Sequence, residues 1–374
     1  MPSWLKEGRG SLCGANVSLL LREMGITKPL LVAGERTKNV FFARTGMRLP
    51  VFDAFHPNPD LQDCVAGAAL YQEKGCDGLI SIGGGSAMDT AKGIKALLMT
   101  DIAHVRANQL PSEGNVPHLA IPGTAGTGAE TTAVAVLYED GQKLSVDHPA
   151  LLPDGVLLDG SLLDTLPEYH RKSCAMDALA QGIESWWAKK ATPDSRIHAE
   201  RAIRGVLDNL TAYLQGDRKA QDEMLHAAYE SGVAILTTRT TAAHAMSYQI
   251  TKKLGAAHGH ACMLTLPHLW AHLAAQAEYQ PMLTELSRLL GGEKAMDGAI
   301  LLKGLLAVLE LDKIPMPDDA TLDMLAASVN PERLGNHPEV LTTAQLRAIY
   351  VQAFTPMTDT ERAEAIAAWE QYGK

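Results

Sequence analysis

The first part of the chain alternates short apolar runs with longer amphipathic stretches. Between the first apolar runs lie stretches of helical length; in 61–74, for example, apolar residues recur at intervals of three and four. Buried strands that alternate with such helices are typical of a parallel sheet with crossover helices. We therefore expect an α/β domain over residues 1–166. Its candidate strands are 29–33, 50–53, 78–82, 118–121, 132–138 and 155–159.

The pattern changes after Pro167. Ala, Leu, Glu, Arg and Gln dominate long runs with helical spacing and no convincing strand. Gly255 interrupts a later helical run. We expect residues 167–374 to form an all-helical domain, with its clearest helices at 171–189, 195–215 and 221–237.

Composition narrows the class of protein. The 374 residues are 46% hydrophobic and 20% charged, which is typical of a globular protein. No apolar run approaches the roughly 20 residues that cross a bilayer, and no secretory signal pattern stands at the N-terminus. The net charge of −10 argues against nucleic acid or an anionic membrane as partner. We expect a cytoplasmic protein.

The five cysteines are widely spaced and form no C-x-x-C pair. This pattern predicts neither a disulfide framework nor a thiolate zinc site. We expect reduced and mostly buried thiols.

A glycine-rich loop follows the third candidate strand. It has the sequence I-G-G-G-S-A-M-D-T-A-K at 82–92 and opens a helix. Gly84 and Gly85 have no Cβ atoms, so a pyrophosphate can come close to the backbone there. Ser86 and the helix N-terminus beside them favour an anion. Asp89 is expected to fix the loop. The spacing is not G-x-G-x-x-G, so a tight turn without a ligand remains an alternative.

A second loop, 121–131, follows the next candidate strand and combines small residues with hydroxyls. Thr124, Thr127 and Thr131 can hydrogen bond to phosphate, ribose or a nicotinamide amide. Taken alone, the loop is also compatible with a flexible hairpin. Two such loops at strand ends of one α/β domain predict nucleotide binding.

Four polar residues of the helical half suggest a metal site. Asp177 and Gln181 share a helix face, and His244 and His258 are fourteen residues apart across the break at Gly255. A carboxylate and two imidazoles suit Fe²⁺, Zn²⁺ or Mn²⁺ with an open position for a substrate oxygen. The alternative is that these are structural or solvated members of a set of 13 histidines.

At these residues the chain resembles the iron-containing (group III) alcohol dehydrogenase family over nearly its whole length. Residues 83–92 look like the family loop G-G-G-S-x-x-D-x-A-K, and 122–132 look like P-T-T-A-G-T-G-S-E-x-T. Asp177, His244 and His258 fall on its metal-ligand motifs. The resemblance implies the dehydroquinate synthase-like fold, an NAD(P)H-dependent oxidoreductase, a homodimer and a catalytic metal, with Fe²⁺ expected before Zn²⁺ or Mn²⁺.

Two positions depart from the family pattern. Gln181 stands where the family usually has a metal-binding histidine, and Tyr248 stands where it often has a histidine near the substrate. Gln is a weaker neutral donor, so either the metal affinity falls or a water takes its place as ligand. Tyr248 would serve either in a proton relay or as a wall that shapes the site.

Both departures resemble a subgroup, the phosphonoacetaldehyde (2-hydroxyethylphosphonate) reductases. The runs Q-x-I-E-S-x-W and T-T-A-x-H-A-x-S-Y fit 181–187 and 240–248. Arg239 precedes the second run, and its guanidinium would hold a phosphonate or sulfonate through two parallel hydrogen bonds. An ordinary surface arginine is the alternative.

The choice of cofactor stays open. Gly34 stands where NAD-selective family members place an aspartate that binds the ribose, so a 2′-phosphate would not be repelled. Arg36 would pair with that phosphate, whereas Glu35 would bind the ribose of NAD. The balance slightly favours NADPH. Lys143 falls on the family position for a lysine beside the cofactor.

These expectations predict reduction of a small anionic aldehyde, phosphonoacetaldehyde, to its primary alcohol. Sulfoacetaldehyde reduction and general short-chain alcohol dehydrogenation are the enzymatic alternatives. A catalytically silent nucleotide-binding protein is the alternative of another class, because the change at Gln181 permits loss of the metal.

Overall fold

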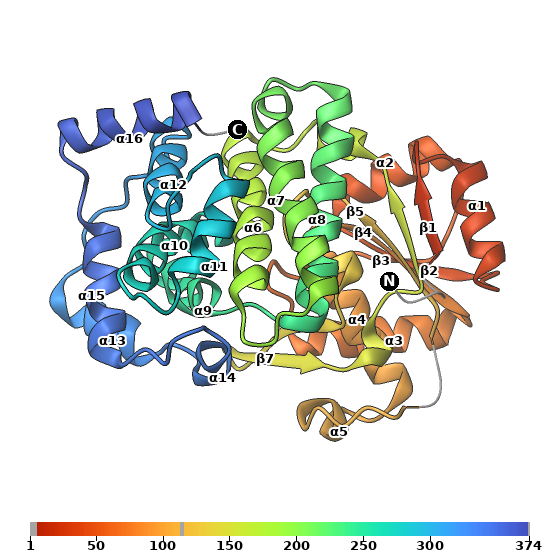
Figure 1. Ribbon diagram of the computed structural model, residues 1–374. Helices are drawn as coiled ribbons and strands as arrows, with labels where there is room; N and C mark the ends of the chain where they lie inside the picture. The colour runs from red at the N-terminus through yellow and green to blue at the C-terminus, as the bar shows by residue number, and fades with distance from the viewer. Residues whose placement is uncertain (1–5, 113–115, 373–374) are drawn as a thin grey trace. The chain divides into compact units, whose positions relative to one another are not determined.

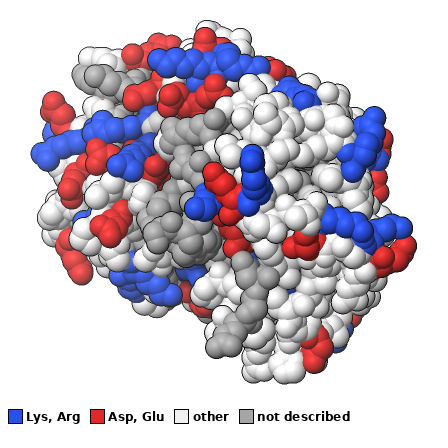
Figure 2. Space-filling view, turned by 90° about the vertical axis from the view of Figure 1, so that its right-hand side faces the viewer, with Lys and Arg blue, Asp and Glu red and all other residues white. Residues whose placement is uncertain are grey.

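The computed structural model describes residues 6–112 and 116–372. The chain divides into two compact units, Met1–Thr165 and Leu166–Lys374. None of the helices in the described part is long and apolar enough to cross a membrane. On the face in Figure 2, acidic and basic side chains are interspersed.

A six-stranded parallel sheet forms the centre of the N-terminal unit (Figure 1). The strand order is β1-β8-β5-β4-β2-β3, and every neighbouring pair is parallel. This confirms the α/β fold expected from the sequence. The strands are β1 (Lys6–Arg9), β2 (Pro29–Ala33), β3 (Val51–Phe52), β4 (Gly78–Gly83), β5 (His118–Pro122) and β8 (Gly155–Leu158).

Helices cover both faces of this sheet. Leu31 and Ile80 pack into one core with α1 and α2, whereas Leu30 and Leu79 pack into another core with α3 and α4. Because both faces are buried, the central strands have continuous apolar sequences rather than alternating ones. The helices are α1 (Gly14–Glu23), α2 (Glu35–Thr45), α3 (Leu61–Lys74), α4 (Gly85–Met99) and α5 (Ile102–Arg106), with 3₁₀ turns at Ala129–Thr131, Pro149–Leu151 and Gly160–Leu163.

The apolar run at 132–138 is not a strand of the parallel sheet, contrary to the expectation from the sequence. Instead β6 (Val134–Glu139) pairs antiparallel with β7 (Gln142–Asp147). Asp140 and Gly141 join them with φ values of 49° and 73°. A two-residue hairpin turn requires these left-handed values, and Asp-Gly is a common pair that adopts them.

The second unit is helical, and its described residues contain no strand. This confirms the all-helical expectation. The helical run around Gly255 is broken as expected, because a π-helical turn (Ile250–Leu254) ends there with φ of 75° before α10 begins at His258. The helices are α6 (Glu168–Trp187), α7 (Pro193–Leu214), α8 (Arg218–Thr238), α9 (Ala242–Gln249), α10 (His258–Ala274), α11 (Gln280–Leu289), α12 (Asp297–Val308), α13 (Asp319–Ala327), α14 (Pro331–Gly335), α15 (Thr343–Phe354) and α16 (Asp359–Tyr372).

Candidate functional site

Four side chains from three helices of the second unit bring metal-binding atoms together. Asp177 comes from α6, His244 from α9, and His258 and Cys262 from α10. One donor atom of each lies within 4.8 Å of the other three. The structure therefore gathers three predicted ligands and adds the thiol of Cys262, for which the sequence predicts only a reduced and buried cysteine. The signal for Cys262 was its place one helical turn after His258.

His244 is held by a carboxylate on the side away from the other donors. Its Nδ1 is hydrogen bonded to Glu184 of α6, and its Nε2 lies 3.2 Å from Oδ1 of Asp177. The other oxygen of Glu184 accepts hydrogen bonds from the backbone N–H groups of Thr241 and Ala243, at 3.1 and 2.8 Å. Helix carbonyls cannot bind these N–H groups at the start of α9. Glu184 thus caps α9 and turns Nε2 of His244 toward the other donors.

His258 is placed by close packing between α10 and α6. A Cβ on the next residue, Gly259, would lie 1.9 Å from the carbonyl oxygen of Ser173. Only glycine permits this approach, which brings the first turn of α10 against the part of α6 that carries Asp177. Nδ1 of His258 lies 3.2 Å from Oγ of Ser247, so Nε2 faces the other donors, 3.9 Å from Oδ1 of Asp177.

The amide oxygen of Gln181 is engaged inside the helical unit. It accepts a hydrogen bond of 2.8 Å from Oγ of Ser231 on α8, and both residues are buried. Gln181 does lie one turn after Asp177 on α6, as the spacing predicts. Its role as a metal ligand stays a prediction.

The four donors are electrostatically coupled. Burial alone would raise the pKa of Asp177, but His258 and His244 outweigh it and hold the pKa below its usual value. Burial also acts to raise the pKa of the Cys262 thiol, while the same two imidazoles lower it to about 7. The same coupling raises the pKa values of the His244 and His258 imidazoles, so without a metal it favours a carboxylate and a thiolate paired with two protonated imidazoles. A metal ion that binds all four groups would displace the imidazole protons.

These groups fit a divalent metal ion. One carboxylate oxygen, two imidazole nitrogens and a sulfur are all ligands that such ions accept. Three of the four residues are buried, whereas 37% of the His258 side chain is exposed. A substrate can therefore reach the cluster on the His258 side.

Tyr248 stands on this exposed side. Its ring stacks on that of His258, with centroids 5.9 Å apart and ring planes 2° apart. The structure therefore places the predicted proton-relay residue directly against a candidate ligand.

Arg239 ends α8, two residues before Thr241, whose backbone N–H binds Glu184. Its φ of 61° and ψ of 177° lie in a region that is essentially reserved for glycine. Its Nη1 donates a hydrogen bond of 2.6 Å to the carbonyl of Leu236. An arginine is thus held in a strained backbone next to the segment that carries His244.

In the N-terminal unit, the two predicted cofactor loops lie side by side. They follow β4 and β5, which are neighbouring parallel strands. A Cβ on Gly84 would lie 3.2 Å from Cγ2 of Thr124, and a Cβ on Gly85 would lie 3.5 Å from Cγ2 of Thr127. The backbone of one loop and the threonines of the other therefore share one edge of the sheet.

The strand order of the sheet reverses between β2 and β4, next to the strands that carry the two loops. Ligands of open α/β sheets bind at the carboxyl ends of strands at such a point. Gly34 precedes α2 and Gly84 precedes α4, and neither helix start has a side-chain cap. Two helix N-termini with uncapped N–H groups form a suitable site for a pyrophosphate.

Charged residues of α4 hold the first loop in place. Nζ of buried Lys92 donates to the carbonyls of Ala129 and Val134, at 2.7 and 2.9 Å, and so ties α4 to the end of the second loop and to the start of β6. Burial raises the pKa of Asp89 to about 6 against the opposing charges of Lys92 and Lys143. Asp89 and Lys143 therefore interact electrostatically, and both were predicted to lie near the cofactor.

Gly34, at the end of β2, has free space on the side where a Cβ would stand. A Cβ on Gly34 would meet no heavy atom within 4 Å. Arg36 is exposed, and its Nη1 donates to the carbonyl of Thr165 at 2.9 Å. Oγ of Ser86 accepts a hydrogen bond from the backbone N–H of Asn58 at 3.3 Å, which joins the first loop to the chain after β3.

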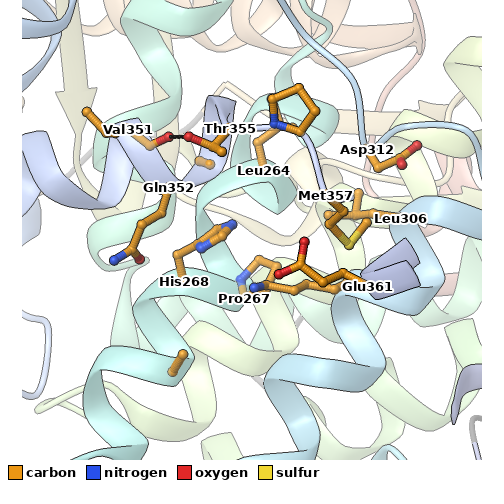
Figure 3. Close-up of a pocket in the computed structure, with 14 residues that line it drawn as sticks. Leu264, Pro267, His268, Leu306, Asp312, Val351, Gln352, Thr355, Met357 and Glu361 are labelled. Atoms are coloured by element: carbon orange, nitrogen blue, oxygen red, sulfur yellow. Dashed lines mark hydrogen bonds between the residues drawn. The ribbon is translucent and has the colours of Figure 1, made fainter. Parts of the chain in front are cut away.

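A pocket of about 460 Å³ lies elsewhere in the second unit (Figure 3). Leu264 and His268 of α10 line it, with Glu361 pointing toward it from α16. None of the described residues that line this pocket is one of the four metal-binding side chains. The pocket is therefore separate from the metal donors.

Comparisons with known proteins agree with this geometry. Residues 3–160 match the family described as iron-containing alcohol dehydrogenase, and residues 172–354 match the C-terminal part of the Fe-containing alcohol dehydrogenase family. The NAD-dependent methanol dehydrogenase of Bacillus methanolicus is 30% identical over 299 residues, which cover 75% of this chain and 77% of that protein.

Two of the similar proteins are named as reductases of small anionic aldehydes. The phosphonoacetaldehyde reductase of Streptomyces viridochromogenes is 36% identical over 228 residues, covering 57% of this chain and 58% of that protein. The crystal structure of sulfoacetaldehyde reductase from Bifidobacterium kashiwanohense with NAD⁺ has a TM-score of 0.84 and 26% identity, covering 95% of this chain and 97% of that one. Among the first sequence relatives, the chain spans 58% to 77% of their length.

The contact between Glu184 and His244 generates a first prediction. Glu184→Gln keeps the shape of the side chain but removes the charge that orients the imidazole, so we expect metal affinity to fall by roughly 10- to 100-fold. Competition with a chromogenic chelator measures it. The control is Glu168→Gln, an exposed carboxylate at the start of the same helix. Equal affinities of Glu184→Gln and wild type would contradict this role.

The cofactor loops generate a second prediction. Gly84→Val places a branched side chain where even a Cβ is 3.2 Å from Thr124. We expect the affinity for NADH and NADPH to fall at least ~10-fold, because the backbone can no longer approach a pyrophosphate. Fluorescence titration of each cofactor measures it, with Gly335→Ala, an open position of the second unit, as control. Unchanged binding would show that the loop does not contact the cofactor.

Proposed function

Because the chain belongs to the iron-containing alcohol dehydrogenase family, we propose that it interconverts an aldehyde and a primary alcohol with NAD(P)H and a divalent metal. The observation that carries this proposal is the convergence of Asp177, His244 and His258 with the orienting carboxylate of Glu184. A silent nucleotide-binding protein would have no need of so ordered a set of donors. The proposed substrate is phosphonoacetaldehyde, which is reduced to 2-hydroxyethylphosphonate.

The chemistry divides between the bound groups and the chain. The metal supplies Lewis-acid polarisation of the aldehyde oxygen, and NAD(P)H supplies the hydride. Asp177, His244 and His258 hold the metal. The Gly84 and Thr124 loops hold the dinucleotide through backbone N–H groups and hydroxyls.

Tyr248 is the proposed proton donor. The alcohol product needs one proton at the former carbonyl oxygen, and the phenol stands on the open side of the cluster, stacked on His258. Oη releases that proton and recovers one from solvent. The stacking fixes the plane of the ring.

Arg239 is the proposed specificity residue. A two-carbon aldehyde offers little apolar surface, so its binding energy must come from the charged head group. A guanidinium binds phosphonate or sulfonate oxygens in pairs. The strained backbone supports a functional role, because glycine would occupy this conformation without strain.

Sulfoacetaldehyde is the second candidate substrate. The similarity in fold to a sulfoacetaldehyde reductase over 95% of this chain favours it, and a sulfonate has nearly the shape of a phosphonate. A third substrate, propanal, represents neutral aldehydes. Steady-state kinetics with the three aldehydes, each with NADH and NADPH after reconstitution with Fe²⁺, Zn²⁺ or Mn²⁺, tests the proposal. The highest kcat/KM on propanal would contradict an anionic substrate.

Arg239→Gly gives a prediction that separates function from folding. We expect kcat/KM for phosphonoacetaldehyde to fall roughly 10- to 100-fold because charge-assisted hydrogen bonds are lost, with propanal nearly unaffected. Relief of the backbone strain, worth about 1–3 kcal/mol, should leave the free energy of unfolding equal or higher. Urea denaturation checks stability, and Arg204→Ala on the exposed side of α7 is the control. Equal losses on both substrates would remove the assignment.

Tyr248→Phe tests the proton donor. The ring still stacks on His258, so we expect metal content and KM to stay the same while kcat falls at least ~10-fold. An unchanged kcat with an unchanged pH profile would make Tyr248 a wall of the site.

A further inference from the structure

Cys262 occupies the fourth corner of the donor cluster. It follows His258 by one turn of α10, is fully buried, and has Sγ 3.9 Å from Nε2 of His258. Together with Asp177 and His244 it keeps every donor-to-donor distance within 4.8 Å.

The fourth ligand expected from the sequence, Gln181, has its oxygen in another contact. That oxygen accepts a hydrogen bond from Ser231 in the interface between α6 and α8. To bind a metal, this oxygen would have to share its lone pairs with the buried hydroxyl of Ser231 or give up that hydrogen bond. A neutral amide oxygen would also bind a cation more weakly than an anionic ligand.

From this geometry we infer that the Cys262 thiolate, and not Gln181, is the fourth protein ligand of the metal, and that the site prefers Zn²⁺ to Mn²⁺. The Sγ–metal bond forms as the thiol proton leaves to solvent, with no change of oxidation state. The inference rests on the metal site of the proposed function and specifies its ligands.

Charge balance supports the assignment. Asp177 and Cys262 each contribute one negative charge, which together offset a buried divalent ion, whereas Asp177 alone would leave a net positive charge in a low-dielectric interior. The charge of Glu184 lies one residue further out and is already met by the N–H groups at the start of α9.

The type of donor atom also affects which metal ion binds most tightly. Thiolate sulfur favours Zn²⁺ over Mn²⁺, and Zn²⁺ accepts mixed nitrogen, oxygen and sulfur ligands. Four protein ligands are compatible with catalysis, because Zn²⁺ can accept a fifth ligand. The partly exposed side of His258 is where that fifth position would open.

X-ray absorption spectroscopy of the Zn²⁺-loaded protein tests the inference without reference to activity. We expect one sulfur at about 2.3 Å and nitrogen or oxygen at about 2.0–2.1 Å. The Co²⁺-loaded protein should show a thiolate-to-cobalt charge-transfer band in the near ultraviolet. Zn²⁺ should bind more tightly than Mn²⁺ in competition with a chelator. A first shell without sulfur would overturn the inference.

Variants assign the sulfur to one residue. Cys262→Ser should abolish the cobalt band and weaken Zn²⁺ binding by at least ~100-fold, whereas Gln181→Ala and Cys174→Ser, a free cysteine of α6 outside the cluster, should retain both. Cys262→Ser with Gln181→His should regain affinity without sulfur, which also shows that the fold survives. A cobalt band retained by Cys262→Ser, or lost in Gln181→Ala, would overturn the assignment.

Failure of this inference differs from failure of the proposed function. Metal-dependent aldehyde reduction with no sulfur in the first shell would refute only the role of Cys262. Sulfur ligation with no reduction of any aldehyde would refute only the proposed reaction.

Discussion

The carboxylate of Glu184 connects the fold of the second unit to its chemistry. One oxygen binds the N–H groups that begin α9, and the other binds the imidazole of His244, so a single buried charge fixes both the position of a helix and the direction of a ligand. The close contact of Gly259 with α6 positions His258 in a similar way. Donors that are far apart in sequence thereby converge within a few ångströms, which no local propensity could achieve.

The N-terminal unit carries the proposed site for the pyrophosphate of the cofactor. Backbone groups rather than side chains form most of this site: two helix starts without a side-chain cap and two loops lie at the carboxyl ends of β2, β4 and β5. The glycines there permit close packing and approach, and buried Lys92 holds the loops in place from within. Because the metal donors and the dinucleotide loops belong to separate units, each binding event can be measured on its own.

The sequence predicts much of this architecture, and the failures have physical causes. Continuous apolar runs identify the buried strands, but the run at 132–138 was assigned to the wrong sheet because periodicity alone does not report strand direction. The hairpin signal was the Asp140-Gly141 pair. The short strand at Lys6–Arg9 was missed because an edge strand needs no apolar run. Cys262 was passed over because cysteine motifs are sought by spacing to other cysteines, whereas here its partners are histidines and an aspartate from other turns and helices.

The central claim is that the helical unit holds a single catalytic metal through Asp177, His244 and His258. Elemental analysis of chelator-treated protein, reloaded and freed of excess metal, tests it most directly when wild type is compared with Asp177→Asn, which preserves the size of the side chain. The account predicts one tightly bound ion per chain in wild type and almost none in the variant. Equal metal content in the two proteins, or no bound ion in either, would contradict it.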